Sequence, residues 1–262
     1  MLNTAPAAPL RRPAALMPVV TTGILPTDAA TVIRQHFVPI LGPVAGHSRA
    51  RITRLSEPGL IRPIVAQVDV RLGHHGVRAQ VAAATMSEVV GLLATRTIEQ
   101  LQLFPTALAR CLRERPATSP PPWPPELRPP HDRRLARHKN CRLTTMTVGE
   151  AIAMLETMDY RFHLFRERYS GQDSVVVRAG SGSRRILQPV PNPIGIDLGS
   201  PPLVLAAAPR SSVAAARARL DLTGAPFEVF TDKAIGRACV LYARYDGHYG
   251  ILRPTGAARR SA

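Results

Sequence analysis

The stretch that decides the fold occurs twice. Residues 162–189 read FHLFRERYSGQDSVVVRAGSGSRRILQP, and residues 227–254 read FEVFTDKAIGRACVLYARYDGHYGILRP. A shift of 65 positions aligns residues 148–189 onto residues 213–254 without a gap, with 12 identities in 42 positions. Most of the identical residues are apolar or glycine, which are the residues that cores and turns require. The second half of the chain is therefore an internal repeat.

Each copy predicts one small α+β unit. A helix, expected over residues 148–157 and 213–222, is followed by a strand that carries F-x-x-F and then by a glycine turn and a hairpin. In the second copy Asp246-Gly247 stands between apolar strands, which is a strong hairpin signal. In the first copy residues 180–182 are expected to form the corresponding tight turn.

The two copies, assigned to residues 142–190 and 204–256, are expected to pack on each other. A unit of about 50 residues buries little core alone, so two related copies favour a pseudo-twofold pair. The phenylalanines are then interpreted as core rather than as a binding site. The predicted repeat-pairing core comprises apolar and aromatic residues of both copies, namely Phe162, Phe165, Phe227, Phe230, Val175, Val240, Tyr242 and Ile251.

The chain is strongly basic, which bears on its partner. Its 262 residues include 34 Lys and Arg against 18 Asp and Glu, for a net charge of +16, and the only lysines are Lys139 and Lys233. Because guanidinium groups bind phosphates bidentately and stack on bases, this balance favours a nucleic acid partner. The alternative is that coding bias has replaced lysine by arginine. With 45% apolar and 20% charged residues, wholesale disorder is excluded.

Charge and proline divide the chain. Residues 105–142 carry nine basic and three acidic residues and include the run PATSPPPWPP from Pro116. Proline removes backbone donors and fixes φ, so this run is expected to be an extended, semi-rigid spacer. We therefore predict a flexible tail over residues 1–16, a first domain over residues 17–104 and a basic linker over residues 105–141.

The first domain is expected to be a small α+β domain with helices on one sheet face. Residues 63–72 alternate apolar and polar and are followed by a turn, which indicates a strand hairpin. Pro39 lies inside the first helical pattern, so that helix should kink or end nearby. The predicted order is β-α-β-β-β-α, with strands over 17–23, 51–55, 63–72 and 77–83 and helices over 28–41 and 88–104.

No catalytic or metal-binding pattern stands out. No phosphate-binding loop or nucleophile elbow occurs where a strand, a turn and a helix would give it meaning. His74 and His75 adjoin at a predicted hairpin tip, and a solvated turn is favoured over a metal site because adjacent residues point to opposite faces. The three cysteines (Cys111, Cys141 and Cys239) are widely spaced and predict neither a disulfide scaffold nor a zinc site. We expect no cofactor, no metal and no membrane span.

The second copy resembles a known family. Its F-x-x-F, glycine and D-G-x-Y-G pattern is similar to the C-terminal domain of long ribosome hibernation promoting factors, and residues 146–158 are similar to the helix of that domain. The first copy lacks the tyrosine and the D-G-x-Y-G turn. The tandem arrangement is most similar to dormancy-associated translation inhibitors of actinobacteria. The matching residues of the second copy are Asp232, Gly236, Tyr242, Arg244, Asp246, Gly247, Tyr249, Gly250 and Pro254.

The resemblance implies a ribosome-binding protein rather than an enzyme. The first domain would bind the decoding channel of the 30S subunit through 16S rRNA, block translation and protect idle 70S ribosomes under stress or dormancy. Recognition of folded RNA by shape and phosphates needs many arginines and no chemistry. The candidate rRNA contacts, taken from the predicted first domain and the linker, are Arg34, His36, Arg49, Arg51, Arg54, Arg71, Arg78, Arg96, Arg128, Arg133, Arg134, Arg137 and Lys139.

The duplication leads to a further expectation. In single-copy members of this family the C-terminal domain pairs with that of another molecule, whereas here the partner copy is in the same chain at a far higher effective concentration. We therefore expect an intramolecular pair, a monomer and silenced single 70S ribosomes in the cytoplasm. The alternative is a general RNA-binding regulatory protein that is not specific to the ribosome; one Trp and 5% aromatic residues offer it few stacking platforms.

Overall fold

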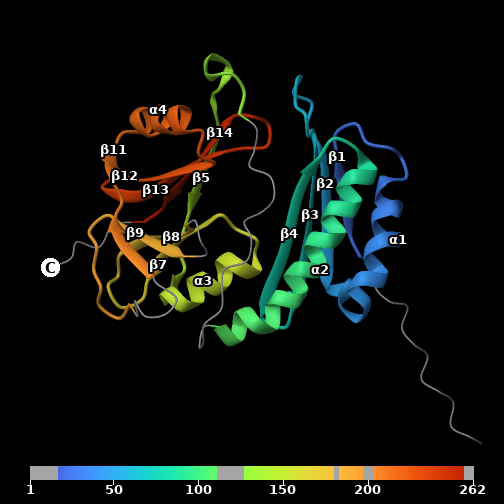
Figure 1. Ribbon diagram of the computed structural model, residues 1–262, viewed down its shortest axis with the longest axis horizontal. Coiled ribbons are helices and arrows are strands. Elements are labelled where there is room, and N and C mark those ends of the chain that lie inside the picture. The colour runs from blue at the N-terminus through green and yellow to red at the C-terminus, as the bar shows by residue number, and fades with distance from the viewer. Residues whose placement is uncertain (1–16, 111–126, 180–182, 197–202, 257–262) are drawn as a thin grey trace, which may run out of the picture.

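The computed structural model describes residues 17–110, 127–179, 183–196 and 203–256. These residues form three sheets with four helices, as Figure 1 shows. The predicted N-terminal tail, the proline-rich run from Pro116 and the turn at residues 180–182 lie outside the described residues. None of the described helices combines the length and the apolar character that crossing a membrane requires.

The first domain has the predicted β-α-β-β-β-α order. Its sheet has the strand order β1-β2-β3-β4, with β1 parallel to β2 and the other pairs antiparallel. The short 3₁₀ helix η1 (Gly42–His47) follows the first helix. The elements are β1 (Val19–Thr22), α1 (Ala29–Leu41), β2 (Ser48–Arg54), β3 (Ile64–Leu72), β4 (His75–Ala83) and α2 (Met86–Arg110).

Alternation in β3 explains why both helices cover one face of this sheet. Ile64, Ala66, Val68 and Val70 are buried, while the residues between them face the other side. The buried face packs against apolar side chains of α1 and α2 in one core. Pro39 lies inside α1, and the helix ends at Leu41, two residues later. The opposite face of the sheet is left for polar and charged side chains.

Each repeat copy contributes one helix and four strands of a five-stranded sheet. The first sheet has the order β10-β9-β8-β7-β6, and the second has the order β11-β12-β13-β14-β5. The first copy consists of β6 (Thr145–Met146), α3 (Val148–Thr157), β7 (Phe162–Glu167), β8 (Asp173–Arg178) and β9 (Arg184–Gln188). The second consists of β11 (Arg210–Ser211), α4 (Val213–Thr223), β12 (Phe227–Asp232), β13 (Arg237–Ala243) and β14 (Tyr249–Pro254).

The copies exchange their leading strands. Strand β5 (Leu135–Cys141) precedes the first copy in the chain but pairs in parallel with β14 of the second. Strand β10 (Leu203–Ala207) precedes the second copy but pairs in parallel with β9 of the first. Residues 135–141, which the sequence analysis placed in the linker, are thus part of a sheet, because the prolines that prevent sheet pairing stop at Pro130, in the 3₁₀ turn η2 (Pro130–Asp132).

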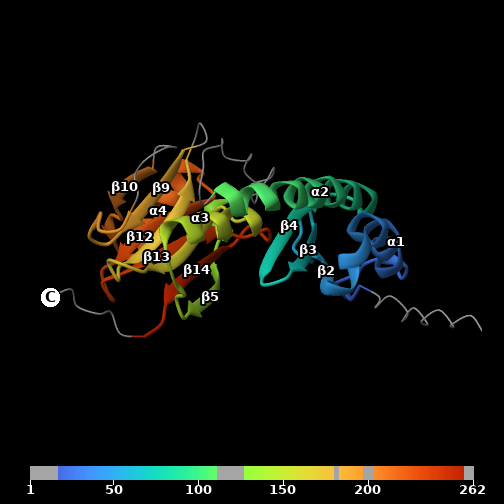
Figure 2. The same cartoon turned by 90° about the horizontal axis from the view of Figure 1, so that it is seen from below.

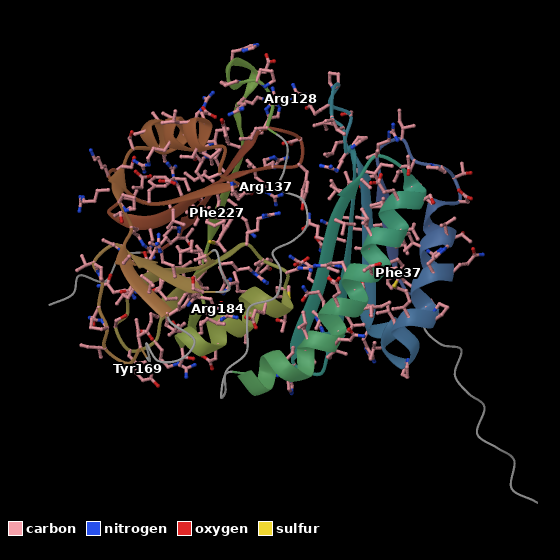
Figure 3. All side chains as sticks on the ribbon, in the orientation of Figure 1. Phe37, Arg128, Arg137, Tyr169, Arg184 and Phe227 are labelled. Carbon is pink, nitrogen blue, oxygen red and sulfur yellow. The ribbon has the colours of Figure 1, made fainter. Side chains whose placement is uncertain are left out.

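The two sheets of the repeats pack face to face. Val175 and Val240 lie in the apolar cluster between them, together with Phe162 and Phe227. The rings of Phe162 and Phe227 are 5.0 Å apart, and that of Tyr242 is 5.9 Å from Phe162. Figure 3 shows Phe227 on the strands of the second copy that face the first copy.

Three residues of the predicted pairing core lie elsewhere. Phe165 belongs to the cluster under α3, while Phe230 and Ile251 belong to the cluster under α4. The prediction that they lie between the copies is wrong, because strand residues one or three apart point to opposite faces: Phe162, Phe227 and Leu252 take the face between the sheets. Each F-x-x-F therefore places one ring between the sheets and one beneath its own helix.

The first domain rests on the first copy. Strand β4 is an edge strand of its sheet, and both α2 and β4 contact α3. Figures 1 and 2 show the C-terminal half of α2 beside α3 from two directions. A second link joins Arg128, at the start of the second described segment, to Glu57 in the loop between β2 and β3.

Candidate nucleic-acid interface

The outer face of the first sheet carries exposed arginines. In β2, Arg49 and Arg51 alternate with the buried Ala50, so both point away from the helices. Arg71 in β3 and Arg54 at the end of β2 are also exposed. These four predicted contacts lie on one domain, and a sheet fixes their spacing better than a loop does.

Asp69 organises part of this face. It accepts hydrogen bonds from Arg78 at 2.6 Å, from Arg49 at 3.4 Å and from Gln67 at 2.7 Å. Burial alone would raise the pKa of Asp69, but the hydrogen bond and charge of Arg78 outweigh it and hold that pKa below its ordinary value. The carboxylate thus stays charged and fixes the two guanidinium groups on neighbouring strands.

The predicted residues of α1 are only partly available. Arg34 is half-buried and donates from Nε to the carbonyl of Met17, which ties the helix to the start of the domain. His36 is exposed, and its Nδ1 lies 2.9 Å from the carbonyl of Val32. Arg34 therefore has a structural task, whereas His36 remains on the surface.

Arg78 and Arg96 are covered by the first repeat. Arg96 is 6% exposed and binds the carboxylate of Asp159. Arg78 donates to the hydroxyl of Tyr160, and its guanidinium lies 5.5 Å from the centre of that ring. In this arrangement of the domains a repeat residue occupies Arg96, and the contact of Arg96 with rRNA stays a prediction.

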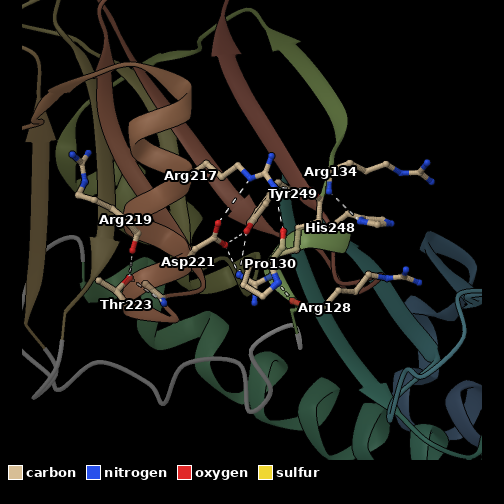
Figure 4. A network of polar contacts seen from close by, with 11 residues as sticks. Arg128, Pro130, Arg134, Arg217, Arg219, Asp221, Thr223, His248 and Tyr249 are labelled. Carbon is tan, nitrogen blue, oxygen red and sulfur yellow. Dashed lines mark hydrogen bonds and ion pairs between the residues drawn. The ribbon is translucent and has the colours of Figure 1, made fainter.

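Two predicted residues of the linker are held by ion pairs. Arg128 pairs with Glu57 and also donates from Nε to the carbonyl of Asp246. Arg133 binds Asp221 of α4, which also accepts a hydrogen bond from the hydroxyl of Tyr249. Figure 4 shows this network between α4 and the strand edge. These two arginines attach the segment that precedes β5 to the first domain, through Glu57, and to the second repeat copy, through Asp246 and Asp221.

The remaining predicted basic residues lie on or next to the edge strand β5. Arg134, Arg137 and Lys139 are all exposed. Figures 1 and 2 place β5 on the side of the repeat pair nearer to the first domain, and Figure 3 labels Arg137 there. The exposed arginines and the lysine among the predicted contacts thus fall into two groups, one on the first sheet and one along β5.

Comparisons with known proteins identify the family. The family model described as "Sigma 54 modulation/S30EA ribosomal protein C terminus" matches residues 130–183 and 206–251. The chain is 34% identical over 226 residues to the "Dormancy associated translation inhibitor" of Mycobacterium tuberculosis (strain CDC 1551 / Oshkosh), which covers 81% of this chain and 78% of the relative. The protein of that name in strain ATCC 25618 / H37Rv has the same identity and coverage. The chain belongs to the ribosome hibernation promoting factor family.

The sequence patterns do not reveal the partners of these arginines. Asp69 is one of the polar residues in the alternation of residues 63–72, and no motif contains Asp159 or Tyr160. A signal for Asp159 was present, since the 65-residue shift aligns it with Gly224, so that an acidic residue replaces a glycine at a helix end. Among the described residues no group of His, Cys, Asp and Glu could hold a metal ion.

Proposed function

We propose that this chain is a ribosome hibernation factor: it binds the decoding channel of the small subunit through 16S rRNA, blocks translation and stabilises idle 70S ribosomes under stress or dormancy. Membership of the family gives the chain a ribosome-associated role in translation, and its Mycobacterium tuberculosis relatives are named translation inhibitors. To this role the proposal adds the binding site, which is the decoding channel, and the bound form of the ribosome, which is the idle 70S particle.

One observation carries the proposal. The first domain presents Arg49, Arg51 and Arg71 on the sheet face opposite α1 and α2, and Asp69 accepts a hydrogen bond from Arg49. Guanidinium groups at fixed positions along the strands of a sheet suit a folded RNA, whose phosphates also have fixed positions. Binding of this kind needs no catalytic group, so the proposed function is not enzymatic.

The strand exchange supports a monomeric factor. Both sheets of the pair are completed within one chain, by β5 and β10, and the apolar surface between the copies is covered. A second molecule would have to displace a strand that is already in place at high effective concentration. We therefore propose that the factor silences single 70S ribosomes and does not couple two of them.

Sedimentation with purified 70S ribosomes tests the proposal. The protein is expected to migrate with the 70S peak in sucrose gradients at low and moderate salt, without a 100S peak. A 100S peak would disprove the monomeric mode while keeping the family role. Protein that stays at the top of the gradient, but binds unrelated structured RNA, would favour the general RNA-binding alternative.

A matched pair of double variants locates the interface. Arg51→Ala with Arg71→Ala removes two exposed charges from the first sheet, whereas Arg185→Ala with Arg210→Ala removes two exposed charges from the repeat pair. The first variant should lower the salt slope of 70S binding by about two, because each lost phosphate contact lowers it by about one. The second variant should bind like the wild type; an equal loss in both would contradict the proposed site.

A further inference from the structure

A set of hydrogen-bond donors on the first domain converges on one carboxylate of the first repeat. Arg96 donates to Asp159 from Nε at 3.3 Å and from Nη2 at 2.7 Å. Gln100, one turn further along α2, donates from Nε2 at 3.3 Å, and the backbone N–H of Gln80 on the edge strand β4 donates at 3.4 Å. We call these three residues the anion cradle. A guanidinium fork, an amide and a backbone N–H are together the donors that bind oxyanions.

The carboxylate in the cradle stands at a position that favours glycine. Asp159 directly follows the C-cap of α3 and has φ 52°, and no other non-glycine residue in the described ranges has a positive φ. In the second copy the aligned residue is Gly224, with φ 63°. Left-handed backbone is disfavoured for a residue with a Cβ, so the first copy accepts strain that the second avoids. This backbone conformation places the carboxylate of Asp159 in the anion cradle.

The docked arrangement leaves one buried acceptor unused. Gln100 is fully buried, and its Oε1 accepts no hydrogen bond within the described parts of the chain. A buried acceptor without a donor costs free energy, so the contact is not optimised as a permanent one. An RNA backbone carries both phosphates, which suit the donors of the cradle, and ribose hydroxyls, which donate to such an acceptor.

The residue after Asp159 covers a second predicted RNA contact. The Tyr160 hydroxyl accepts from Arg78, and its ring lies against that guanidinium. Residues 159 and 160 thus bind two arginines of the proposed RNA-binding domain at once. Both arginines were predicted as rRNA contacts, and both are withheld while the domains are docked.

We propose that the anion cradle is a binding site for an RNA backbone phosphate, and that Asp159 occupies it in the free protein. The docked chain is then an inhibited form, and rRNA competes with the first repeat for Arg96, Gln100 and the edge of β4. This proposal rests on the proposed function, since it concerns the same domain and the same class of ligand. Because the competing carboxylate is in the same chain, it restricts binding at every protein concentration.

Removing the carboxylate tests the competition. Asp159→Gly relieves the backbone strain and Asp159→Asn keeps a residue that tolerates left-handed backbone, so both variants are expected to fold. Either variant should bind 70S ribosomes at least about tenfold more tightly, since charge-assisted hydrogen bonds that oppose binding are lost. Small-angle scattering should show a larger radius of gyration for the free variants than for the wild type.

Asp132→Asn is the matched control for net charge. It raises the charge by one, as Asp159→Asn does, but Asp132 is exposed and contacts only His131 among the ion pairs of the described residues. Its affinity and its scattering should equal those of the wild type. An equal gain in this control would mean that charge alone explains tighter binding, and it would overturn the competition.

An Arg96→Ala variant distinguishes a phosphate-binding site from a contact that only holds the two domains together. In the Asp159→Gly background, Arg96→Ala should weaken 70S binding about tenfold, whereas Arg185→Ala should leave it unchanged. If Arg96→Ala has no effect in that background, the cradle is not a phosphate site. If Asp159→Gly opens the chain but weakens binding, the docked form is the active one, and the proposal is wrong. Failure of the wild type itself to bind 70S ribosomes would instead refute the proposed function.

Discussion

The two repeat copies share a fold but use their helices differently. Helix α3 lies against the first domain, and its C-terminal end inserts Asp159 between α2 and β4. Helix α4 instead holds the segment that precedes β5: Arg217 donates to the carbonyls of Pro130 and Arg133. Duplication thus supplied two equivalent surfaces, one of which binds the neighbouring domain while the other anchors the chain that leads into the pair.

One contact between the helix and the last strand occurs in both copies, although the residues that make it differ. Glu156 of α3 pairs with Arg184 of β9, and both are buried. The 65-residue shift aligns them with Asp221 and Tyr249, which are also hydrogen-bonded to each other. An acidic residue on the helix therefore binds the first residue of the last strand in both copies. In the second copy, Arg133 from outside the repeat joins the pair.

The largest effect is expected where the copies are most alike. Phe165→Ala and Phe230→Ala each remove a fully buried ring from beneath the copy's own helix. Each should lower the free energy of unfolding by about 3–5 kcal/mol, as large-to-small core substitutions do. Urea denaturation followed by circular dichroism measures this. Losses that differ by more than about 2 kcal/mol would show that the two cores are not equivalent.

Substitution of the aligned acidic residues Glu156 and Asp221 should destabilise the two copies to different extents. Glu156→Gln removes the negative charge from the buried pair with Arg184, and breaking a buried pair costs about 3–5 kcal/mol. Asp221→Asn should cost about 1–2 kcal/mol, because Asp221 is partly exposed and solvent screens the charge that it presents to Arg133 and Tyr249. Urea midpoints of the two variants measure the contrast. The reverse order would show that Arg133 makes the second network the stronger one.

Lowering the pH should reduce the stability of the first copy through His163. Burial lowers the pKa of His163 to about 4, and its ring stacks between Tyr160 and Phe165. The unfolded chain therefore takes up a proton first as pH falls below about 6.5, and stability drops between pH 6.5 and 4 by at most about 1.4 kcal/mol per unit.

The aligned residue of the second copy is Glu228, which pairs with Arg219. His163→Gln should flatten the stability profile between pH 6.5 and 4, as measured by urea titrations at several pH values. A variant whose profile is as steep as that of the wild type would exclude His163 as the cause.

The smallest effect concerns the helix ends. Gly224→Asp places the residue of the first copy in the second, where a Cβ has open space but φ is 63°. It should cost about 1–2 kcal/mol of stability, the price of left-handed backbone in a residue with a Cβ. Thermal melts of the wild type and of Gly224→Asp measure this cost, and a stabilised Gly224→Asp would contradict the reasoning.

Much of this architecture was predictable from periodicity. The alternation of residues 63–72 predicted the hairpin of the first domain, and the 65-residue repeat predicted the pair. The exchange of β5 and β10 was not predictable, because β5 reads LARHKNC and carries neither alternation nor β-branched residues. Its strand conformation comes from the partner β14, which no local pattern reveals.

The candidate site was also predictable only in part, because some of its residues depend on contacts between domains. Exposed arginines on strands follow from alternation, and the structure places Arg49, Arg51 and Arg71 on the open face. Burial of Arg96 depends on a contact with Asp159, 63 residues away. Patterns along the sequence report faces of single elements, whereas contacts between domains depend on how complete units dock.

The exchanged strand also sets an order of events during synthesis. Strand β5 has no partner until β14, which ends at Pro254, has left the exit tunnel, whereas the first domain is complete once α2 has emerged. The first domain can therefore fold while the repeats are still being translated, and the pairing of such distant strands comes late and slowly. A newly made chain thus passes through a stage in which its arginine face is formed before Asp159 has a finished repeat to hold it in place.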